Sequence, residues 1–157
     1  RRKSVSGFSL VELMIGIDII GIIAAIDAPN FFAYRENTNL KEAARDISSD
    51  ILYWKQRAVS DSAAYRINFN ASSSYTIQQV TGSVVTDLTT KNISPGNASI
   101  AINGTPSFMP GGVTYVTLNA RGTSTNGSIK LIHNKRLSEA TITVNIMGRV
   151  KVEYVLK

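Results

Sequence analysis

Glu12 is the residue near the start of the chain whose surroundings give it chemical meaning. It follows the basic stretch Arg1-Arg2-Lys3 and the pair Gly7-Phe8, and it heads a largely apolar run. A carboxylate on a helix inside a bilayer is costly, so such an acid marks a functional site by default. A charge in an apolar assembly needs a partner of opposite sign, because breaking a buried ion pair costs about 3–5 kcal/mol. Glu12 is therefore predicted to act by electrostatic pairing rather than as a solvated residue at a helix start.

Basic residues near the C-terminus form the second candidate site. Gly148 marks a sharp turn, and Arg149 and Lys151 then lie two residues apart, which places both cations on one face of a strand. Such a face can contact phosphate groups, and the alternative is ordinary solvated charge on an exposed strand. Lys130 and Arg136 are candidates for extending this patch. No aromatic residues alternate with these cations, so the prediction is sequence-independent, salt-sensitive binding.

The charge distribution agrees with a basic C-terminal third. Residues 100–157 carry seven basic side chains and only two acidic ones, Glu139 and Glu153, and Glu153 would weaken a phosphate site on its own strand face. A surface of this sign attracts polyanions. The seven basic residues are Arg121, Lys130, Lys135, Arg136, Arg149, Lys151 and Lys157.

Catalytic and metal-binding chemistry finds no support in the composition. The chain of 157 residues has no cysteine and one histidine, His133, for which a structural or surface role is the prediction. Asp46 and Asp50 lie four residues apart and are interpreted as part of a solvated helix face. We predict no catalytic residue, no metal, no cofactor and no enzymatic activity.

The apolar run that carries Glu12 covers residues 8–28. Its length suits a membrane span of about 20 residues, and no small-residue cleavage site follows it as in an ordinary secretory signal. Asp18 and Asp27 interrupt the run, and each costs about 2.5–3.5 kcal/mol at a bilayer centre. Either the span inserts poorly or the two aspartates are solubilising substitutions, and we favour the second hypothesis.

A second helical pattern follows Pro29, which is predicted to bend or break the helix because proline lacks the N–H donor. Apolar residues then recur at spacings of three and four, which predicts an amphipathic helix to about residue 60. The stripe consists of Leu40, Ala44, Ile47, Ile51, Trp54 and Ala58.

Beyond residue 62 the apolar period changes to two, which is typical of half-buried strands. The clearest strands lie at 65–69, 75–77, 142–146 and 150–156, and Asn126-Gly127 is the cleanest hairpin turn. Residues 81–99 are predicted to form a long loop with room for one strand. The pattern predicts an α+β fold in which a long N-terminal helix packs on antiparallel sheet.

The basic leader, Gly7-Phe8, Glu12 and the apolar run together resemble the signal of type IV pilins and pseudopilins. The succession of strand and turn segments from Phe108 to Val152 resembles that of GspH/FimT-type minor pilins and pseudopilins. The resemblance implies two small sheets of about seven or eight strands in all. It also implies a prepilin leader at 1–7, a membrane or filament-core helix at 8–29 and a globular pilin domain at 30–157.

The same resemblance implies a function. A prepilin peptidase would cut between Gly7 and Phe8, and Phe8 would be methylated. The helix would hold the chain in the inner membrane until other subunits take it into a periplasmic or extracellular filament. That filament is a type IV pilus or a type II secretion pseudopilus, with this subunit at or near the tip.

Two alternatives for the function stay open. FimT-type pilins of naturally competent bacteria carry a glycine–arginine–any–arginine motif implicated in DNA uptake, and here its last position is Lys151. The chain would then bind extracellular DNA. A pseudopilin that contacts secretion cargo is the other alternative.

Overall fold

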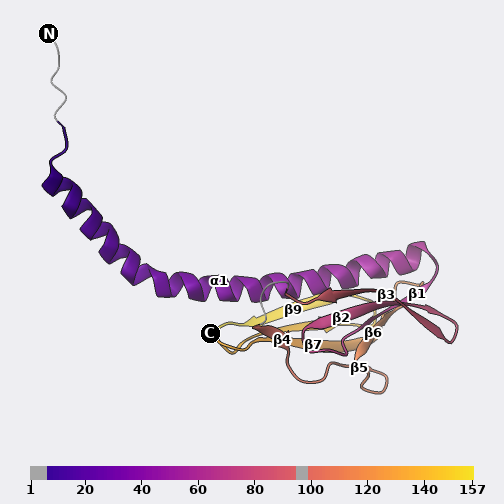
Figure 1. Ribbon diagram of the computed structural model, residues 1–157. Coiled ribbons are helices and arrows are strands. Elements are labelled where there is room, and N and C mark those ends of the chain that lie inside the picture. Colours follow the sequence, from indigo (N-terminus) through magenta and orange to yellow (C-terminus); the bar gives the residue numbers. More distant parts are fainter. Residues whose placement is uncertain (1–6, 95–98) are drawn as a thin grey trace, which may run out of the picture. The chain divides into compact units, whose positions relative to one another are not determined.

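The computed structural model describes residues 7–94 and 99–157, in which one long helix is followed by nine strands (Figure 1). Side chains are described for these residues except 26–30 and 33. The chain divides between Arg35 and Glu36 into two units, and each is described by itself. The elements are α1 (Leu10–Ser60), β1 (Ala64–Asn68), β2 (Ser74–Thr81), β3 (Val84–Asn92), β4 (Ile100–Ile102), β5 (Ser107–Met109), β6 (Tyr115–Leu118), β7 (Asn126–His133), β8 (Ser138–Val144) and β9 (Val150–Val155).

Helix α1 runs without interruption through position 29, so the predicted break at Pro29 is wrong. Proline removes a single N–H donor from the helix, while the turns on either side keep their own hydrogen bonds. The bend at Pro29 stays a prediction. The side chains of Pro29 and Asp27 lie outside the described residues.

The predicted apolar stripe of the second helical segment is buried, which confirms this part of the prediction. Leu40, Ala44 and Ile51 are fully buried, and Trp54 packs at the edge of the core with its ring 5.0 Å from that of Tyr65. Full burial of an aliphatic side chain of this size stabilises the fold by roughly 1.5–3 kcal/mol. The stripe therefore holds residues 36–60 of α1 on the sheets.

Two antiparallel sheets complete the fold, and they confirm the α+β class. One has the strand order β3-β2-β1-β6. The other has the order β4-β7-β8-β9, with β5 paired to a second stretch of β7. The described residues thus form nine strands rather than seven or eight, because β4 and β5 are short strands of three residues that share one partner.

One local prediction about the sheets fails. Asn126-Gly127 is not a hairpin turn but the start of β7, where Gly127 faces Phe108 of β5 and Val144 of β8. A Cβ on Gly127 would lie 2.3 Å from the carbonyl oxygen of Ser107, so the glycine permits close approach of two strands. The segment 81–99 contains the nine-residue strand β3, as the prediction of room for one strand allowed, and all nine residues of β3 are exposed.

A single core joins the helix to both sheets. Its largest fully buried side chains are Phe108, Leu40, Ile47, Ile51, Ile67, Ile77, Ile93, Ile100, Leu118, Ile129, Leu131 and Ile142. On β9 the residues Val150, Val152 and Tyr154 pack against this core, as their alternation predicts. Lys151 and Glu153 consequently face outward.

Candidate functional site

The N-terminal candidate site lies where α1 begins. Gly7 and Phe8 precede the helix, and Phe8 is 85% exposed. The backbone N–H of Ser9 donates to Oε2 of Glu12 at 3.3 Å, and the N–H of Leu13 donates to the carbonyl oxygen of Ser9 at 3.1 Å. Ser9 and Glu12 thus have the spacing of a capping box, in which the carboxylate at the third helical position reaches back to the capping residue.

The cap gives Glu12 a defined place in the single chain. Its carboxylate lies in the first turn of the helix, where the macrodipole favours negative charge. Because Glu12 is exposed, its second carboxylate oxygen is accessible to solvent or to a cationic group. The group can therefore cap its own helix and accept a hydrogen bond from a neighbour.

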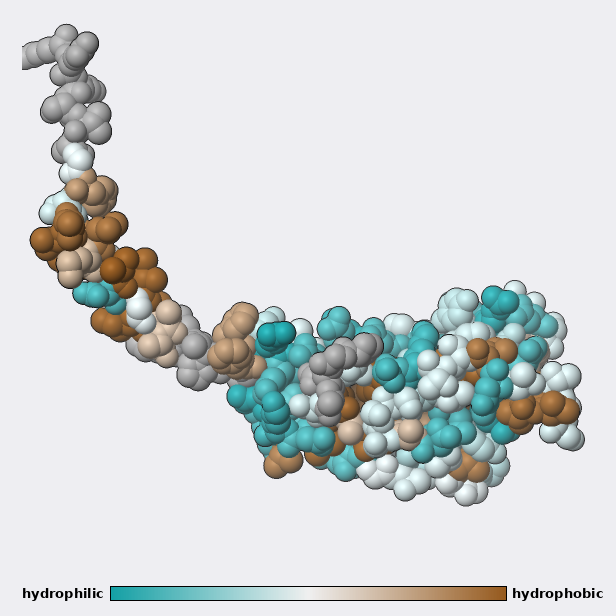
Figure 2. Space-filling model, in the orientation of Figure 1, coloured by the Kyte–Doolittle hydropathy of each residue, from teal (hydrophilic) through white to brown (hydrophobic). Residues whose placement is uncertain are grey.

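Exposed apolar side chains cover the first four turns of α1. Figure 2 shows this brown surface along the N-terminal part of the molecule, interrupted by hydrophilic atoms. Asp18 is exposed among them. An extended apolar surface of this kind marks a site of contact with another protein or with lipid. The exposed residues are Phe8, Leu10, Val11, Leu13, Met14, Ile15, Ile17, Ile19, Ile20, Ile22 and Ile23.

Hydropathy along the described part of α1 nowhere reaches the level of a membrane-crossing helix.

Arg149 follows the turn that joins β8 to β9. Oδ1 of Asn145 accepts hydrogen bonds from the backbone N–H groups of Met147, at 3.0 Å, and Arg149, at 2.9 Å. Gly148 has φ +66°, which favours glycine, and a Cβ there would lie 2.7 Å from Cδ of Lys55. The turn is closed by its own asparagine and is packed on the helix, and Arg149 is exposed beside it.

The other predicted cations do not form one unpaired basic patch with Arg149. Lys151 forms an ion pair with Glu153 at 2.6 Å, and this hydrogen bond raises the pKa of Lys151 above its usual value. Arg136 forms an ion pair with Glu36 at 3.0 Å. It lies in the turn between β7 and β8, at the opposite end of β8 from Arg149.

Lys130 is exposed on the outward face of β7. It faces Thr141 of β8, which in turn faces Glu153 of β9, so an acidic group lies two strands away. The four predicted cations are therefore spread over one sheet face and two of its ends.

Two cations near Arg149 were missed by sequence reasoning. Nζ of Lys55 donates to the carbonyl oxygens of Met147, at 2.8 Å, and Gly148, at 3.3 Å. A Cβ on Gly122 would lie 3.7 Å from Cε of Lys55, so the neighbouring Arg121 belongs to the same region. Gly122 and Gly148, in two tight turns, were the only sequence signal for this proximity.

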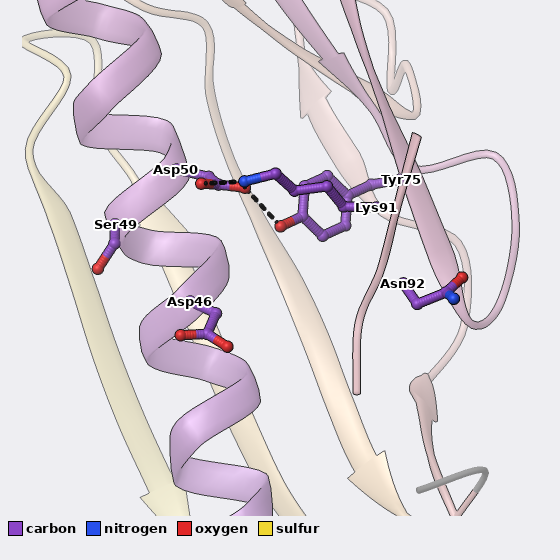
Figure 3. A pocket seen from close by; sticks show the side chains of 6 residues that line it. All are labelled: Asp46, Ser49, Asp50, Tyr75, Lys91 and Asn92. Carbon is purple, nitrogen blue, oxygen red and sulfur yellow. Dashed lines mark hydrogen bonds and ion pairs between the residues drawn. The ribbon is translucent and has the colours of Figure 1, made fainter. Parts of the chain in front are cut away.

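A polar pocket of about 340 Å³ lies between α1 and the strands β2 and β3 (Figure 3). The carboxylate of Asp50 accepts a hydrogen bond from the Tyr75 hydroxyl at 2.6 Å and forms an ion pair with Nζ of Lys91 at 2.8 Å. Burial, and then the hydrogen bond to Asp50, raise the pKa of Tyr75 above its ordinary value. Asp50 was interpreted as a solvated residue, but it joins the helix to the sheet.

The described residues offer no cluster of three metal-ligating side chains. His133 is buried on β7, and neither of its ring nitrogens has a hydrogen-bond partner among the residues that the structure describes. Its position in the sheet is structural, as the prediction of a structural or surface role allowed.

The helix with its apolar N-terminal surface and the two antiparallel sheets define a pilin-like class of protein. Residues 43–148 match the family described as type II transport protein GspH, and residues 2–26 match the prokaryotic N-terminal methylation motif. The chain belongs to the GspH family, which confirms the resemblance to minor pilins and pseudopilins.

Solved structures show the same fold. The minor pseudopilin EpsH from the type 2 secretion system of Vibrio cholerae superposes with a TM-score of 0.60 at 9% identity, over 73% of this chain and 96% of that one. The type IV minor pilin FimU of Pseudomonas aeruginosa superposes with a TM-score of 0.57 at 21% identity, over 76% and 92%.

Curated relatives match only over a short segment. The type IV major pilin protein PilA of Myxococcus xanthus is 42% identical over 52 residues, which are 33% of this chain and 23% of that protein. A fimbrial protein of Pseudomonas aeruginosa is 43% identical over 47 residues, or 30% of each chain. The chain thus matches less than a third of the length of these relatives.

Proposed function

We propose that this chain is a structural minor pilin or pseudopilin subunit. It is cut after Gly7, methylated on Phe8, and held in the inner membrane by its N-terminal helix until assembly. Other pilin or pseudopilin subunits then take it into a type IV pilus or a type II secretion pseudopilus, at or near the tip.

The observation that carries this proposal is the exposed apolar surface of α1. Eleven large apolar side chains between Phe8 and Ile23 are each more than half exposed. Removing apolar surface from water stabilises an assembly by about 25 cal/mol per Å², so helices from several subunits would bury what one chain leaves exposed. Family membership and the methylation motif agree with this role.

Glu12 supplies the electrostatic part of the proposal. Cleavage after Gly7 leaves a cationic amine on Phe8, and the Glu12 carboxylate of a neighbouring subunit would pair with it. The cap on Ser9 fixes the first turn of the helix, so the carboxylate is already oriented before a partner arrives.

Two substitutions at Glu12 separate its cap from its charge. Glutamine also fits the capping box, so Glu12→Gln keeps the helix start and removes only the charge. We expect Glu12→Gln and Glu12→Ala to be processed normally and to enter filaments at least about tenfold less than the wild type, as loss of a buried pair implies. Sheared filaments quantified by immunoblot, with mass spectrometry of the N-terminus, measure both steps.

The matched control is Glu42→Gln, which removes an exposed carboxylate from the same helix. Normal incorporation of Glu12→Gln would remove the pairing role. Poor incorporation of Glu42→Gln as well would mean that assembly responds to helix charge in general.

DNA binding is the second candidate function, favoured by the exposure of Arg149 next to a tight turn. Lys151 is the weaker member of the motif, because Glu153 neutralises it. We expect salt-sensitive binding of labelled duplex DNA that is lost in Arg149→Gln/Lys151→Gln and kept in Lys130→Gln. No binding of the full chain at low salt would exclude this function. Contact with secretion cargo is the remaining alternative.

A further inference from the structure

Exposed apolar side chains gather at the turn between β8 and β9. Ile146 is 65% exposed and Met147 is 64% exposed. A groove of about 540 Å³ adjoins Ile146, and Met109, 60% exposed, lies on its lining. Single exposed apolar residues are common, but Met109 and Ile146 line one groove and Met147 follows Ile146 directly in the chain. Together they form a patch of the kind that binds a partner.

The turn is held in place by two residues from other parts of the chain. Oγ of Ser124 donates to the carbonyl oxygen of Asn145 at 2.7 Å, and the N–H of Ser124 donates to the carbonyl oxygen of Ile146 at 2.9 Å. Lys55, which lies on helix α1, donates to the carbonyl oxygens of the next two residues, Met147 and Gly148. The apolar pair is therefore presented by a rigid backbone, so binding would require little ordering.

Three cations lie on the segments that adjoin this patch. Lys55 lies between the turns at Gly122 and Gly148, and the residues next to those glycines are Arg121 and Arg149. Both arginines are exposed, and neither forms an ion pair within the described part of the chain. We call the six residues Met109, Ile146, Met147, Lys55, Arg121 and Arg149 the turn surface.

We propose that the turn surface binds an acidic segment of a partner protein. An apolar side chain of that segment fills the groove beside Ile146 and Met109, and its flanking carboxylates face Arg121 and Arg149. Charge complementarity identifies the occupant, because the patch presents cations with no acid of its own to neutralise them. This inference goes beyond assembly through α1, since it concerns a different surface.

A protein fits the turn surface better than a nucleic acid does. Phosphates would satisfy the arginines but would leave the groove and the Ile146–Met147 pair exposed to water. A bidentate guanidinium–carboxylate contact satisfies the same arginines, while an apolar neighbour covers the groove.

The test selects peptides from a random 12-residue phage-displayed library on the full chain in mild detergent. We expect enriched peptides to carry at least two acidic residues around an apolar one. Synthetic copies of these peptides should bind Arg121→Gln/Arg149→Gln and Ile146→Ser/Met147→Ser at least about tenfold more weakly than the wild type. Circular dichroism and thermal midpoints verify that these exposed substitutions leave the fold intact.

Matched controls change the same kinds of residue elsewhere. Val84→Ser/Leu88→Ser removes exposed apolar side chains from β3, and Lys130→Gln/Lys135→Gln removes exposed cations from β7 and the turn that follows it. Peptide binding to both controls should stay within about twofold of the wild type.

Three results would overturn the proposal. The library yields no binder, or the enriched peptides lack acidic residues, or their binding is indifferent to both turn-surface variants. Duplex DNA that binds through Arg121 and Arg149 without any effect of Ile146→Ser/Met147→Ser would replace the protein partner with a nucleic acid.

Discussion

The two units of this chain share one helix but bury its apolar residues differently. Ile17 in the first unit is 59% exposed, whereas Ile51 in the second is fully buried and belongs to the core. The two residues have the same type and the same secondary structure. Their difference shows that the second unit supplies its own partner surface within the chain, while the first depends on surfaces from outside it.

The largest test of this difference compares isoleucine truncations in the two units. Ile142→Ala leaves a cavity in a fully buried site and should lower the free energy of unfolding by about 2–5 kcal/mol. Ile17→Ala should leave it unchanged within about 0.5 kcal/mol, because no cavity forms on an exposed face. Chemical denaturation followed by tryptophan fluorescence measures both. Equal effects would mean that the two units fold as one packed body.

A smaller change in the free energy of unfolding is expected when the polar contact between α1 and the sheet in the second unit is removed. Tyr75→Phe removes a hydrogen bond to a carboxylate and should lower the free energy of unfolding by roughly 1.5–3 kcal/mol at neutral pH. Tyr53→Phe, on the exposed side of the helix, is the control.

The same tyrosine predicts a pH dependence with a definite sign. Burial raises the pKa of Tyr75 in the folded state above its unfolded value of about 10. Its contribution to stability is therefore complete below pH 10 and is lost as pH rises beyond it, because the unfolded state releases the proton first. Wild-type stability should fall above about pH 10, and more steeply than that of Tyr75→Phe. Parallel alkaline profiles would contradict this assignment.

The smallest effect concerns the turn that bears Arg149. Gly148→Ala places a side chain at φ +66°, which costs about 1–2 kcal/mol, and its Cβ would press on Lys55. Lys55→Ala removes the steric conflict but also two hydrogen bonds to the turn, so Gly148→Ala/Lys55→Ala is compared with Lys55→Ala alone. In that background Gly148→Ala should cost only the backbone part. Thermal unfolding of the single and double variants separates the two. An additive double variant would mean that Lys55 moves aside without cost.

Local patterns predicted much of this molecule. The spacing of Leu40, Ala44 and Ile51 identified the buried helix face, and the alternation from Val150 to Tyr154 identified the last strand. Both follow from a period that a single element imposes on its own residues.

Contacts between distant segments could not be read in this way. Arg136 pairs with Glu36, one hundred residues away, and Lys55 reaches carbonyl oxygens more than ninety residues along the chain. Asn126-Gly127 has the composition of a turn. Gly127 is instead required in β7 because strand β5 packs too close to it for any side chain to fit. The basic candidate site was therefore predicted by residue type but not by arrangement.

Strand β3 has a consequence for colloidal behaviour. It is the terminal strand of its sheet, and its nine exposed residues leave a row of backbone donors and acceptors along its outer edge. Such an edge can template growth of sheet onto sheet. Asp87 and Lys91 place opposite charges along it, and the register shift opposite Ile77 and Gln78 interrupts its regular ladder. Both features work against the addition of a further strand at this edge.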